Sequence, residues 1–399
     1  MIEIFYLSIY VFSLLIIGFA TIITGGTYGE AIDVNINNIG ISILLLVYLS
    51  TYIFFYCFYK KTQNNMLRIK KFPIFVINRR LIHGFYFICL LISFIGTYNY
   101  GVGKLEAEVT TNLGFLFNLI KFNEFFPIYY VAAREKNKNL YWINILFFCI
   151  LRTTQGWTSW IMQIAVLELF FRCKEKGWIR RIFKLFKSKI LAALGILCGT
   201  GLYYYVSPLK NVIREGGNLS HYKISLFETF MALVERFCNF AVYTSAWQNA
   251  NKISSMYKLQ NIFISEFKTL FIPLVPSFIM RNKDIRSLGN IVQWAMWPGM
   301  TNGTSTGYGF LMYWYTLLRC SIADFIVCAS VSLILFILTC SILNGFDNEE
   351  HDIKIVYFIF LVSIANGSSI VSIFSYGYIG SLYLILVMIL FGVIKIKIK

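Results

Sequence analysis

Long apolar runs follow one another along almost the whole chain and are separated by short polar segments. Most of them approach the ~18 to 22 residues that a helix needs to cross a hydrocarbon core of about 30 Å. The runs are Ile4–Thr24, Ile39–Phe58, Leu81–Tyr98, Phe115–Ala133, Leu140–Leu151, Trp157–Phe171, Ile190–Val206, Ile322–Leu343, Ile355–Phe374 and Ile379–Ile394. This pattern predicts an all-α, polytopic membrane protein with about ten transmembrane helices. The fifth and sixth runs are the shortest and are closely joined.

One polar stretch, from Leu209 to about Phe310, interrupts this succession of apolar runs. It predicts three parts of the chain: transmembrane helices one to seven in residues 1–208, a large loop with amphipathic helices in 209–320, and helices eight to ten in 321–399. The loop is the part of the chain where polar chemistry is concentrated.

Composition supports a membrane protein rather than a soluble domain. Hydrophobic residues make up 58% of the chain, aromatic residues 18% and charged residues only 14%, and the mean hydropathy is +0.66. The first run, Ile4–Thr24, lacks the basic segment that precedes the apolar core of a signal peptide. It is therefore predicted to be a transmembrane span.

Lysine and arginine predict the orientation, because short cytoplasmic loops carry an excess of them. Two connections are strongly basic, the one between spans two and three and the one between spans six and seven; their cations are Lys60, Lys61, Arg68, Lys70, Lys71, Arg79 and Arg80, and Arg172, Lys174, Lys176, Arg180, Arg181, Lys184, Lys187 and Lys189. With these inside, both termini are predicted to be cytoplasmic and the 209–320 loop to lie outside. The acidic connection Asn344–Lys354 also falls inside, but acidic residues contribute little to this rule.

Several kinds of chemistry have no signature in the sequence. The nine cysteines are scattered without a close C-x-x-C pair, and the three histidines, His83, His221 and His351, lie far apart. No zinc motif or nucleotide-binding fingerprint is found. The net charge of +17 is largely explained by the basic cytoplasmic connections. We therefore expect neither a cofactor nor a nucleic-acid partner.

Arg152 is the most informative charged residue outside the loop. It ends an apolar run and opens a short outer turn, Thr153-Thr154-Gln155-Gly156, before Trp157 begins the return span. An arginine at this depth reaches the lipid headgroups, close to interfacial indole rings. One interpretation is contact with ordinary lipid phosphates. The other is that its guanidinium holds the phosphate of a lipid-linked substrate.

Two segments of the loop carry candidate chemistry. Residues Glu228–Ala246 have the spacing of an amphipathic helix, with Glu235 and Arg236 adjacent. Residues Thr301–Gly309 are rich in glycine and hydroxyl groups and run into the aromatic stretch Phe310–Tyr315. Stacked rings beside hydroxyl groups suit a carbohydrate. The alternative is a glycine-rich loop beside an interfacial aromatic belt.

Taken together, these features resemble the Wzy family of O-antigen and capsule repeat-unit polymerases, which is related to the O-antigen ligases. The resemblance lies in the number of spans with one dominant outer loop late in the chain, in the outer turn Leu151-Arg152-Thr153-Thr154, in Glu235-Arg236-Phe237, and in the segment from Gly303 to Tyr315. It covers nearly the whole chain, although each motif is short.

This resemblance implies a glycosyltransferase of the bacterial plasma (inner) membrane with a GT-C-like architecture, which polymerises oligosaccharide repeat units for lipopolysaccharide or capsule. The donor glycan is carried on undecaprenyl diphosphate, and a chain-length regulator and a flippase are expected partners. The family arginines correspond to Arg152 and Arg236, and the base to Glu235 or His221. The implied substrate contacts are Thr304, Ser305, Gly307, Tyr313, Arg319 and Trp157. The ligases use a histidine near the end of the loop, which this sequence lacks.

Other functions stay open at this stage. A flippase or transporter of the same lipid-linked oligosaccharide also needs basic residues near phosphates, but it commonly shows internal repeats or broken helices. A membrane acyltransferase would need a catalytic histidine such as His83. The pair Lys121 and Glu124 lies within an apolar run, three residues apart, where a mutual ion pair is a sufficient explanation.

Overall fold

The computed structural model describes residues 2–24, 37–65, 74–104, 111, 114–120, 122–134, 139–174, 189–215, 218, 222, 225–238, 240–262, 264–266, 288–297, 308–346, 353–366 and 380–397. In these ranges the protein is mostly helical. The helices are α1 (Ile2–Thr24), α2 (Asn38–Asn65), α3 (Arg79–Tyr100), α4 (Gly114–Leu119), α5 (Phe122–Ala132), α6 (Asn139–Thr154), α7 (Ser159–Lys174), α9 (Lys189–Glu215), α10 (Leu226–Glu235), α11 (Phe240–Gln248), α12 (Ala250–Lys258), α14 (Leu288–Met296), α15 (Phe310–Cys320), α16 (Ile322–Phe346), α17 (Lys354–Asn366) and α19 (Gly380–Leu390).

Within the described part of the chain, four helices are long and apolar enough to cross a membrane. They lie at Tyr6–Thr24, Asn38–Thr62, Arg80–Tyr100 and Ile322–Phe346. These are the predicted spans one, two, three and eight. The predicted fourth span is not one helix, because α4 ends at Leu119 and α5 begins at Phe122, with Pro127 inside α5. A membrane protein is thus supported, whereas ten spans are not confirmed.

The prediction of an all-α fold was wrong in one respect. Strand β1 (Ile74–Ile77) pairs with strand β2 (Ile394–Lys397) in an antiparallel two-stranded sheet. The register places Ile74 opposite Lys397 and Ile77 opposite Ile394. The alternation Ile-Lys-Ile-Lys has the period of a strand, and β-branched residues favour strands. The predicted tenth span, Ile379–Ile394, therefore ends at the first residue of β2.

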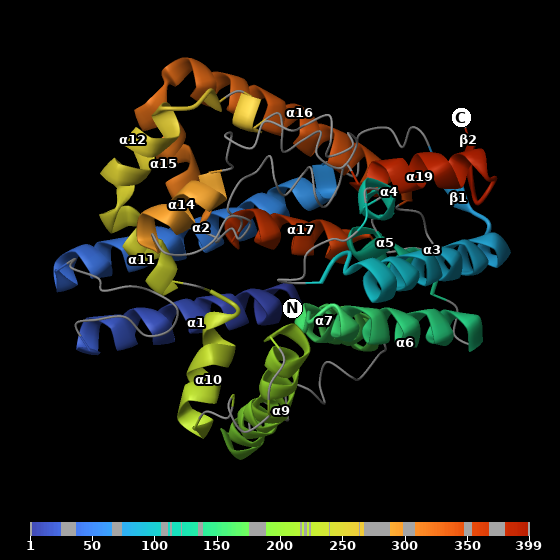
Figure 1. The fold of residues 1–399 in the computed structure, drawn as a ribbon, viewed down its shortest axis with the longest axis horizontal. Helices are drawn as coiled ribbons and strands as arrows, with labels where there is room; N and C mark the ends of the chain where they lie inside the picture. The colour runs from blue at the N-terminus through green and yellow to red at the C-terminus, as the bar shows by residue number, and fades with distance from the viewer. Residues whose placement is uncertain are drawn as a thin grey trace.

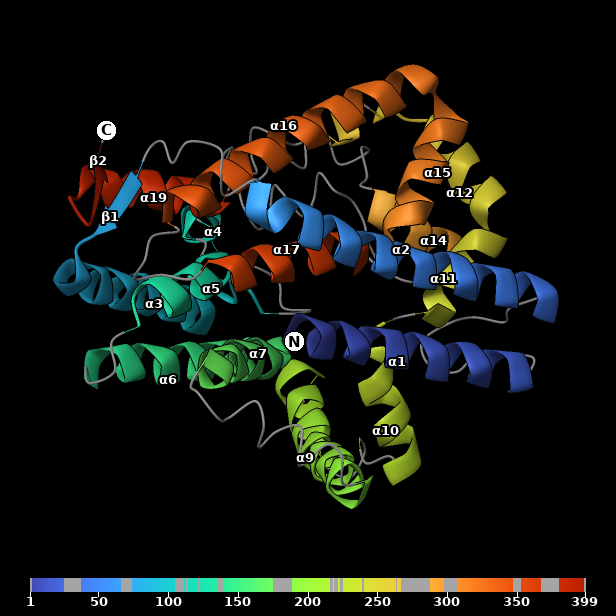
Figure 2. The same ribbon diagram turned by 180° about the vertical axis from the view of Figure 1, so that it is seen from behind.

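Helices α1 and α2 pack antiparallel and form one end of the molecule. The hydroxyl of Tyr59 donates to Glu3 Oε1 at 3.3 Å, and Gly18 lies against Leu45. Close approach of helices at a small residue is common in membranes. Along the longest axis, α3, α6, α19 and the sheet lie at the other end, with α17 between the two groups (Figures 1 and 2).

Helices α3, α5 and α6 form a second group. The hydroxyl of Tyr86 on α3 donates to the carbonyl of Phe122, at the start of α5, at 2.9 Å. The hydroxyl of Tyr129, near the end of α5, is 2.8 Å from Nδ1 of His83. Helix α5 therefore runs antiparallel to α3. Asn144 of α6 donates to the carbonyl of His83 at 2.9 Å, and contacts between the far ends of α3 and α6 show that these two helices are parallel.

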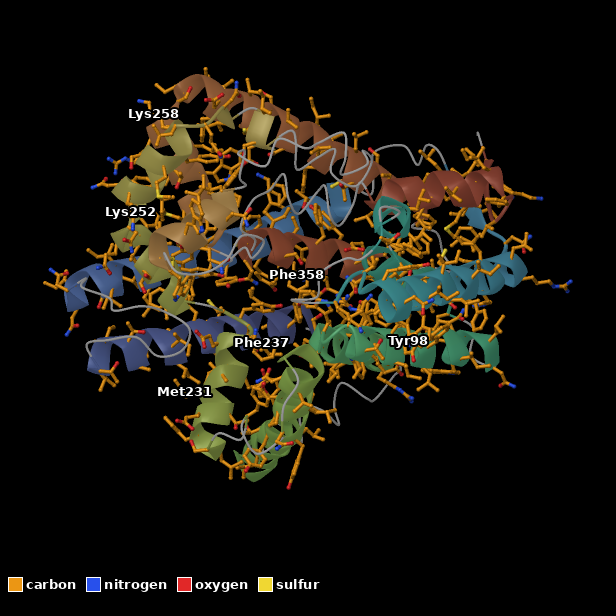
Figure 3. The ribbon with its side chains drawn as sticks, viewed as in Figure 1. Tyr98, Met231, Phe237, Lys252, Lys258 and Phe358 are labelled. Atoms are coloured by element: carbon orange, nitrogen blue, oxygen red, sulfur yellow. The ribbon has the colours of Figure 1, made fainter. Side chains whose placement is uncertain are left out.

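Residues from the predicted loop build a second hydrophobic core. Helices α11, α12, α14 and α15 contribute buried side chains that pack with the beginning of α16. Helix α12 carries Lys252 and Lys258 at the edge of the molecule (Figure 3). Helix α10 is separate from this group and packs against α1, where the ring of Phe237 lies 6.0 Å from that of Tyr10.

Candidate functional site

Arg152 lies in the last turn of α6 and is buried, with 9% of its surface exposed. Its Nη1 donates a hydrogen bond to Oε1 of Gln155 at 2.9 Å, and the guanidinium lies 5.1 Å from the ring centre of Trp157. Its Nε is buried and has no hydrogen-bond partner among the described residues. A buried cation with an unused donor is costly unless something compensates it. The geometry therefore suits an anionic ligand.

The local sequence explains how Arg152 is held. Gly156 has a φ of 79°, which a residue with a side chain rarely adopts, and it ends α6. The N–H of Trp157 donates to the carbonyl of Arg152, and the N–H of Gly156 donates to that of Thr153, both at 2.9 Å. This pair of bonds is a Schellman motif. It brings the guanidinium, Gln155 and Trp157 together within six consecutive residues.

The end of α3 supports this turn. Nε2 of Gln155 donates to Oγ1 of Thr97 at 3.0 Å, and the Thr97 hydroxyl donates to the carbonyl of Val102 at 2.9 Å. Nε1 of Trp157 donates to the carbonyl of Gly103 at 3.1 Å. The C-terminal ends of α3 and α6 are thus held together by side chains on either side of Arg152.

Helix α5 approaches the same site with its first turn. Phe148, one helical turn before Arg152, stacks on Phe126 with ring centres 3.8 Å apart and also contacts Phe122. Glu124, in the first turn of α5, attracts the Arg152 guanidinium electrostatically. The charge of Arg152 is therefore partly compensated by one acidic side chain of α5.

Arg236 and Glu235, the other predicted catalytic pair, lie elsewhere. They are at the end of α10, where Arg236 is exposed and caps the helix with its backbone N–H. The preceding turn packs on α1, since the hydroxyl of Ser13 donates to the carbonyl of Val234. Among the described residues, Arg152 interacts with Gln155, Trp157 and Glu124, and no hydrogen bond links it to Glu235 or Arg236.

The remaining predicted site residues divide into two groups. His221, Thr304, Ser305 and Gly307 lie outside the described residues. Tyr313 is fully buried in the second core, and its hydroxyl donates to Oε2 of Glu266 at 3.2 Å. Burial, and next the charge of Glu266, raise the pKa of Tyr313 well above its usual value. Arg319 is exposed, and its Nη1 donates to the hydroxyl of Tyr315 at 2.9 Å.

Two residues to which the sequence pattern assigns no role are buried and hydrogen-bonded in the structure. Gln155 is 4% exposed and links Arg152 to α3. Glu266 is 3% exposed and also accepts a hydrogen bond from the hydroxyl of Tyr257. Glu266 had a signal in the sequence, since a single acidic residue stands between Ile264 and Phe267 in an otherwise apolar segment. Gln155 had none, because its partner Thr97 is 58 positions away.

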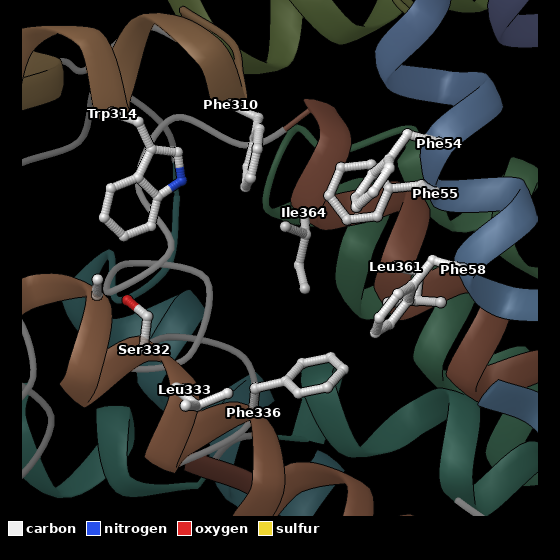
Figure 4. Close-up of a pocket in the computed structure, with 11 residues that line it drawn as sticks. Phe54, Phe55, Phe58, Phe310, Trp314, Ser332, Leu333, Phe336, Leu361 and Ile364 are labelled. Atoms are coloured by element: carbon white, nitrogen blue, oxygen red, sulfur yellow. The ribbon is translucent and has the colours of Figure 1, made fainter. Parts of the chain in front are cut away.

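An apolar cavity of about 270 Å³ opens between α2, α15, α16 and α17. Phenylalanines of α2 face Phe310 and Trp314 of α15 across it, and α16 and α17 complete its wall (Figure 4). The lining residues are Phe54, Phe55, Phe58, Phe310, Trp314, Ala329, Ser332, Leu333, Phe336, Leu361 and Ile364. Two of the four helices, α2 and α16, are candidate spans. Such a surface suits a hydrocarbon chain.

His83, the candidate for acyltransferase chemistry, is 1% exposed. It belongs to a polar cluster with Tyr129 and Asn144 between α3, α5 and α6. Its role there is consistent with joining helices. Among the described residues, no three His, Cys, Asp or Glu side chains are grouped so that they could hold a metal ion. Comparisons with protein-family models, curated proteins and solved structures find no match to this chain.

Proposed function

We propose that the protein is a membrane glycosyltransferase that polymerises oligosaccharide repeat units carried on undecaprenyl diphosphate, at the outer face of a bacterial plasma membrane. The observation that carries the proposal is the buried guanidinium of Arg152, whose Nε has no partner among the described residues. A diphosphate presents paired oxygens that match this group. The sequence resemblance to repeat-unit polymerases points to the same residue.

The proposed reaction is a substitution at an anomeric carbon. A hydroxyl at the non-reducing end of one lipid-linked repeat unit attacks the anomeric carbon of the growing glycan on a second lipid. The bond from that carbon to the diphosphate oxygen breaks, and undecaprenyl diphosphate leaves with the electron pair. The hydroxyl proton passes to a base, for which Glu235 and His221 are the candidates. Arg152 stabilises the charge that develops on the departing oxygen.

The other parts of the molecule offer surfaces for the rest of this substrate. The apolar cavity between α2, α15, α16 and α17 suits part of a long hydrocarbon chain. Arg236 is exposed at the end of α10, where it is accessible to a second phosphate. The Thr304–Gly307 segment is the proposed carbohydrate contact.

The first test is removal of Arg152. In a purified assay with a lipid-linked repeat unit, Arg152→Ala is expected to lower the polymerisation rate by about 10²- to 10³-fold, as for loss of one preorganised donor in a transition state. Arg152→Lys keeps the positive charge but lacks the paired N–H donors of a guanidinium, so it should retain intermediate activity. Arg236→Ala should also abolish long polymers, whereas Arg80→Ala, an exposed arginine at the start of α3, is the matched control. Full activity of Arg152→Ala would remove the proposal.

A flippase for the same lipid-linked oligosaccharide is the second candidate, and one observation favours it. The fourth predicted span is broken between α4 and α5, and Glu124 in the first turn of α5 acts electrostatically on Arg152. Discontinuous helices are common at transporter binding sites. The two functions predict different phenotypes in cells that lack the protein. Loss of a polymerase leaves a surface glycan of one repeat unit, whereas loss of a flippase stops export altogether.

A further inference from the structure

We infer that Gln155 is a positioning residue, which orients the guanidinium of Arg152 toward the phosphate of the substrate without neutralising its charge. This inference rests on the proposed function, because it concerns how Arg152 is presented to a phosphate. It concerns a side chain to which neither the sequence pattern nor the resemblance gives a role.

Both polar atoms of the Gln155 side-chain amide form hydrogen bonds. Its Oε1 accepts from Nη1 of Arg152 at 2.9 Å, and its Nε2 donates to Oγ1 of Thr97 at 3.0 Å. The Thr97 hydroxyl donates its own hydrogen bond to the carbonyl of Val102, so the hydroxyl oxygen can accept the hydrogen bond from Gln155. This chain of donors fixes the orientation of the amide, because the flipped amide would direct N–H groups at the guanidinium.

The space around Gln155 also restricts it. A Cβ atom placed on Gly103 would lie 2.8 Å from Nε2 of Gln155, so the backbone of the turn after α3 packs directly on the amide. Gly103 has a φ of 79° and its carbonyl holds Trp157. The turn at Gly103 therefore contacts both Gln155 and Trp157. Together these two side chains fix the plane of the Arg152 guanidinium.

Gln155 occupies only one edge of the Arg152 guanidinium. Nη1 donates to Gln155, and among the described residues the guanidinium donates no other hydrogen bond, so Nε and the second Nη are the donors left for a pair of phosphate oxygens. A neutral amide suits this task better than a carboxylate. Glutamate at position 155 would form an ion pair with Arg152 and compete with the phosphate.

The test uses purified full-length protein and separates binding from rate. Gln155→Glu is nearly isosteric, and we expect it to raise KM for the lipid-linked donor by about tenfold or more through competition for the cation. Gln155→Leu should lower kcat by about 10- to 100-fold, as expected when a catalytic group is displaced. Thr97→Val should share part of the loss, whereas Thr97→Ser keeps the hydroxyl and should restore activity.

A double-mutant cycle distinguishes positioning from general support of the fold. In an Arg152→Lys background, which we expect to retain intermediate activity, Gln155→Leu should cause little further loss, because its effect passes through the guanidinium. A full, multiplicative loss in that background would overturn the inference. So would wild-type kcat and KM in Gln155→Glu and Thr97→Val, even if Arg152→Ala is inactive. Full activity in Arg152→Ala would instead overturn the proposed function itself.

Discussion

At the scale of single residues, Arg152 combines two properties that rarely occur together, full charge and burial. The charge is compensated by a neutral amide, an indole face and the more distant carboxylate of Glu124. A cation over a tryptophan ring gains about 0.5 to 2 kcal/mol, more when water is excluded. None of these partners forms a close ion pair with it among the described residues. The residue therefore keeps its capacity to bind an anion.

Gly103 provides a residue-scale prediction. Gly103→Ala introduces an unfavourable φ, at a cost of about 1 to 2 kcal/mol, and also a Cβ atom 2.8 Å from the Gln155 amide. Gly392→Ala is the matched control, because Gly392 has a φ of 68° and nothing within 4 Å of the added atom. Both variants should lose similar thermal stability from the backbone. Only Gly103→Ala should also lose polymerisation activity, and equal activity would contradict the packing described here.

The sequence could predict Arg152 and Trp157 but not their support. An arginine at the end of an apolar run, followed by glycine and tryptophan, is visible as a local pattern. The hydrogen bonds of Gln155 with Thr97 and of Trp157 with Gly103 join segments more than fifty positions apart. Such contacts depend on the parallel packing of α3 and α6, which no local pattern encodes.

At the scale of elements, α10 shows how a short helix is defined by its first turn. Ser225 and Glu228 form a capping box, in which each side chain accepts from the backbone N–H of the other residue. Apolar residues on one face pack toward α1 and α9, and Met231 and Val234 are buried. The sequence predicted one amphipathic helix over Glu228–Ala246. The structure ends α10 at Glu235 and starts α11 at Phe240, so Arg236 lies at a helix end rather than within a helix.

The capping box gives a prediction for α10. Ser225→Ala should cost about 1 kcal/mol of local stability, which is roughly a fivefold loss of amide exchange protection in residues 226–235. Ser225→Asn, which keeps an accepting side chain, should restore most of it. The hydrogen bonds from the Ser225 backbone and side chain lower the pKa of Glu228. The stabilisation of α10 by the Glu228 carboxylate is therefore fully present above the ordinary glutamate pKa. It is lost as the pH falls through the lowered pKa. Protection that is unchanged in Ser225→Ala would show that the cap is not needed.

Helix contacts at glycine give a second prediction at this scale. A Cβ on Gly18 would lie 2.5 Å from Leu45 Cδ1, whereas a Cβ on Gly84 of α3 would meet nothing within 4 Å. Gly18→Ala should destabilise the α1–α2 pair by about 1 to 3 kcal/mol through overpacking. Gly84→Ala should be neutral or stabilising, because alanine favours helix by up to about 1 kcal/mol. Thermal stability of the detergent-purified variants, measured as loss of the monodisperse peak, compares them directly. Addition of Leu45→Ala to Gly18→Ala should restore stability if the contact is as described.

The break between α4 and α5 marks a limit of pattern analysis. Residues Phe115–Ala133 read as one apolar run, and the helical period continues across Ile120 without a glycine or proline at the break. Pro127 lies five residues past the start of α5, where its missing N–H costs one helical hydrogen bond. Hydropathy records only the transfer of side chains from water to lipid. It does not record tertiary contacts such as the hydrogen bond from the Tyr86 hydroxyl to the Phe122 carbonyl, at the residue where α5 begins.

At the scale of the whole molecule, α1 contacts the end of α2, and β2 contacts the strand that directly precedes α3. Glu3 of α1 accepts from Tyr59 near the end of α2, and β2 near the carboxyl end pairs with β1, directly before α3. That connection is one of the two most basic segments of the sequence. The predicted orientation, with both termini in the cytoplasm, therefore requires the sheet to lie on the cytoplasmic side, close to Lys395 and Lys397.

The pairing of the chain's last described segment can be tested by cross-linking. In a chain whose nine cysteines are replaced by alanine, Val76→Cys with Lys395→Cys places two thiols at directly opposed positions of the sheet. Opposed Cα atoms in antiparallel strands are about 4.5 to 5.5 Å apart, within the range of a disulfide. Ile77→Cys with Lys397→Cys is the matched control, offset by three positions in the register.

With a protease site inserted after Asn348, the two fragments of the cleaved chain should stay joined on a non-reducing gel only in the opposed pair. The same thiol at position 395 also reports on orientation, because a membrane-impermeant maleimide added to intact cells should not label it when β2 is cytoplasmic. Efficient cross-linking in both pairs would show a flexible tail rather than a strand. Labelling from outside would place the sheet, and with it both ends of the chain, on the opposite face, and Arg152 would then lie on the side of the membrane where a periplasmic or surface polymerase could not use it.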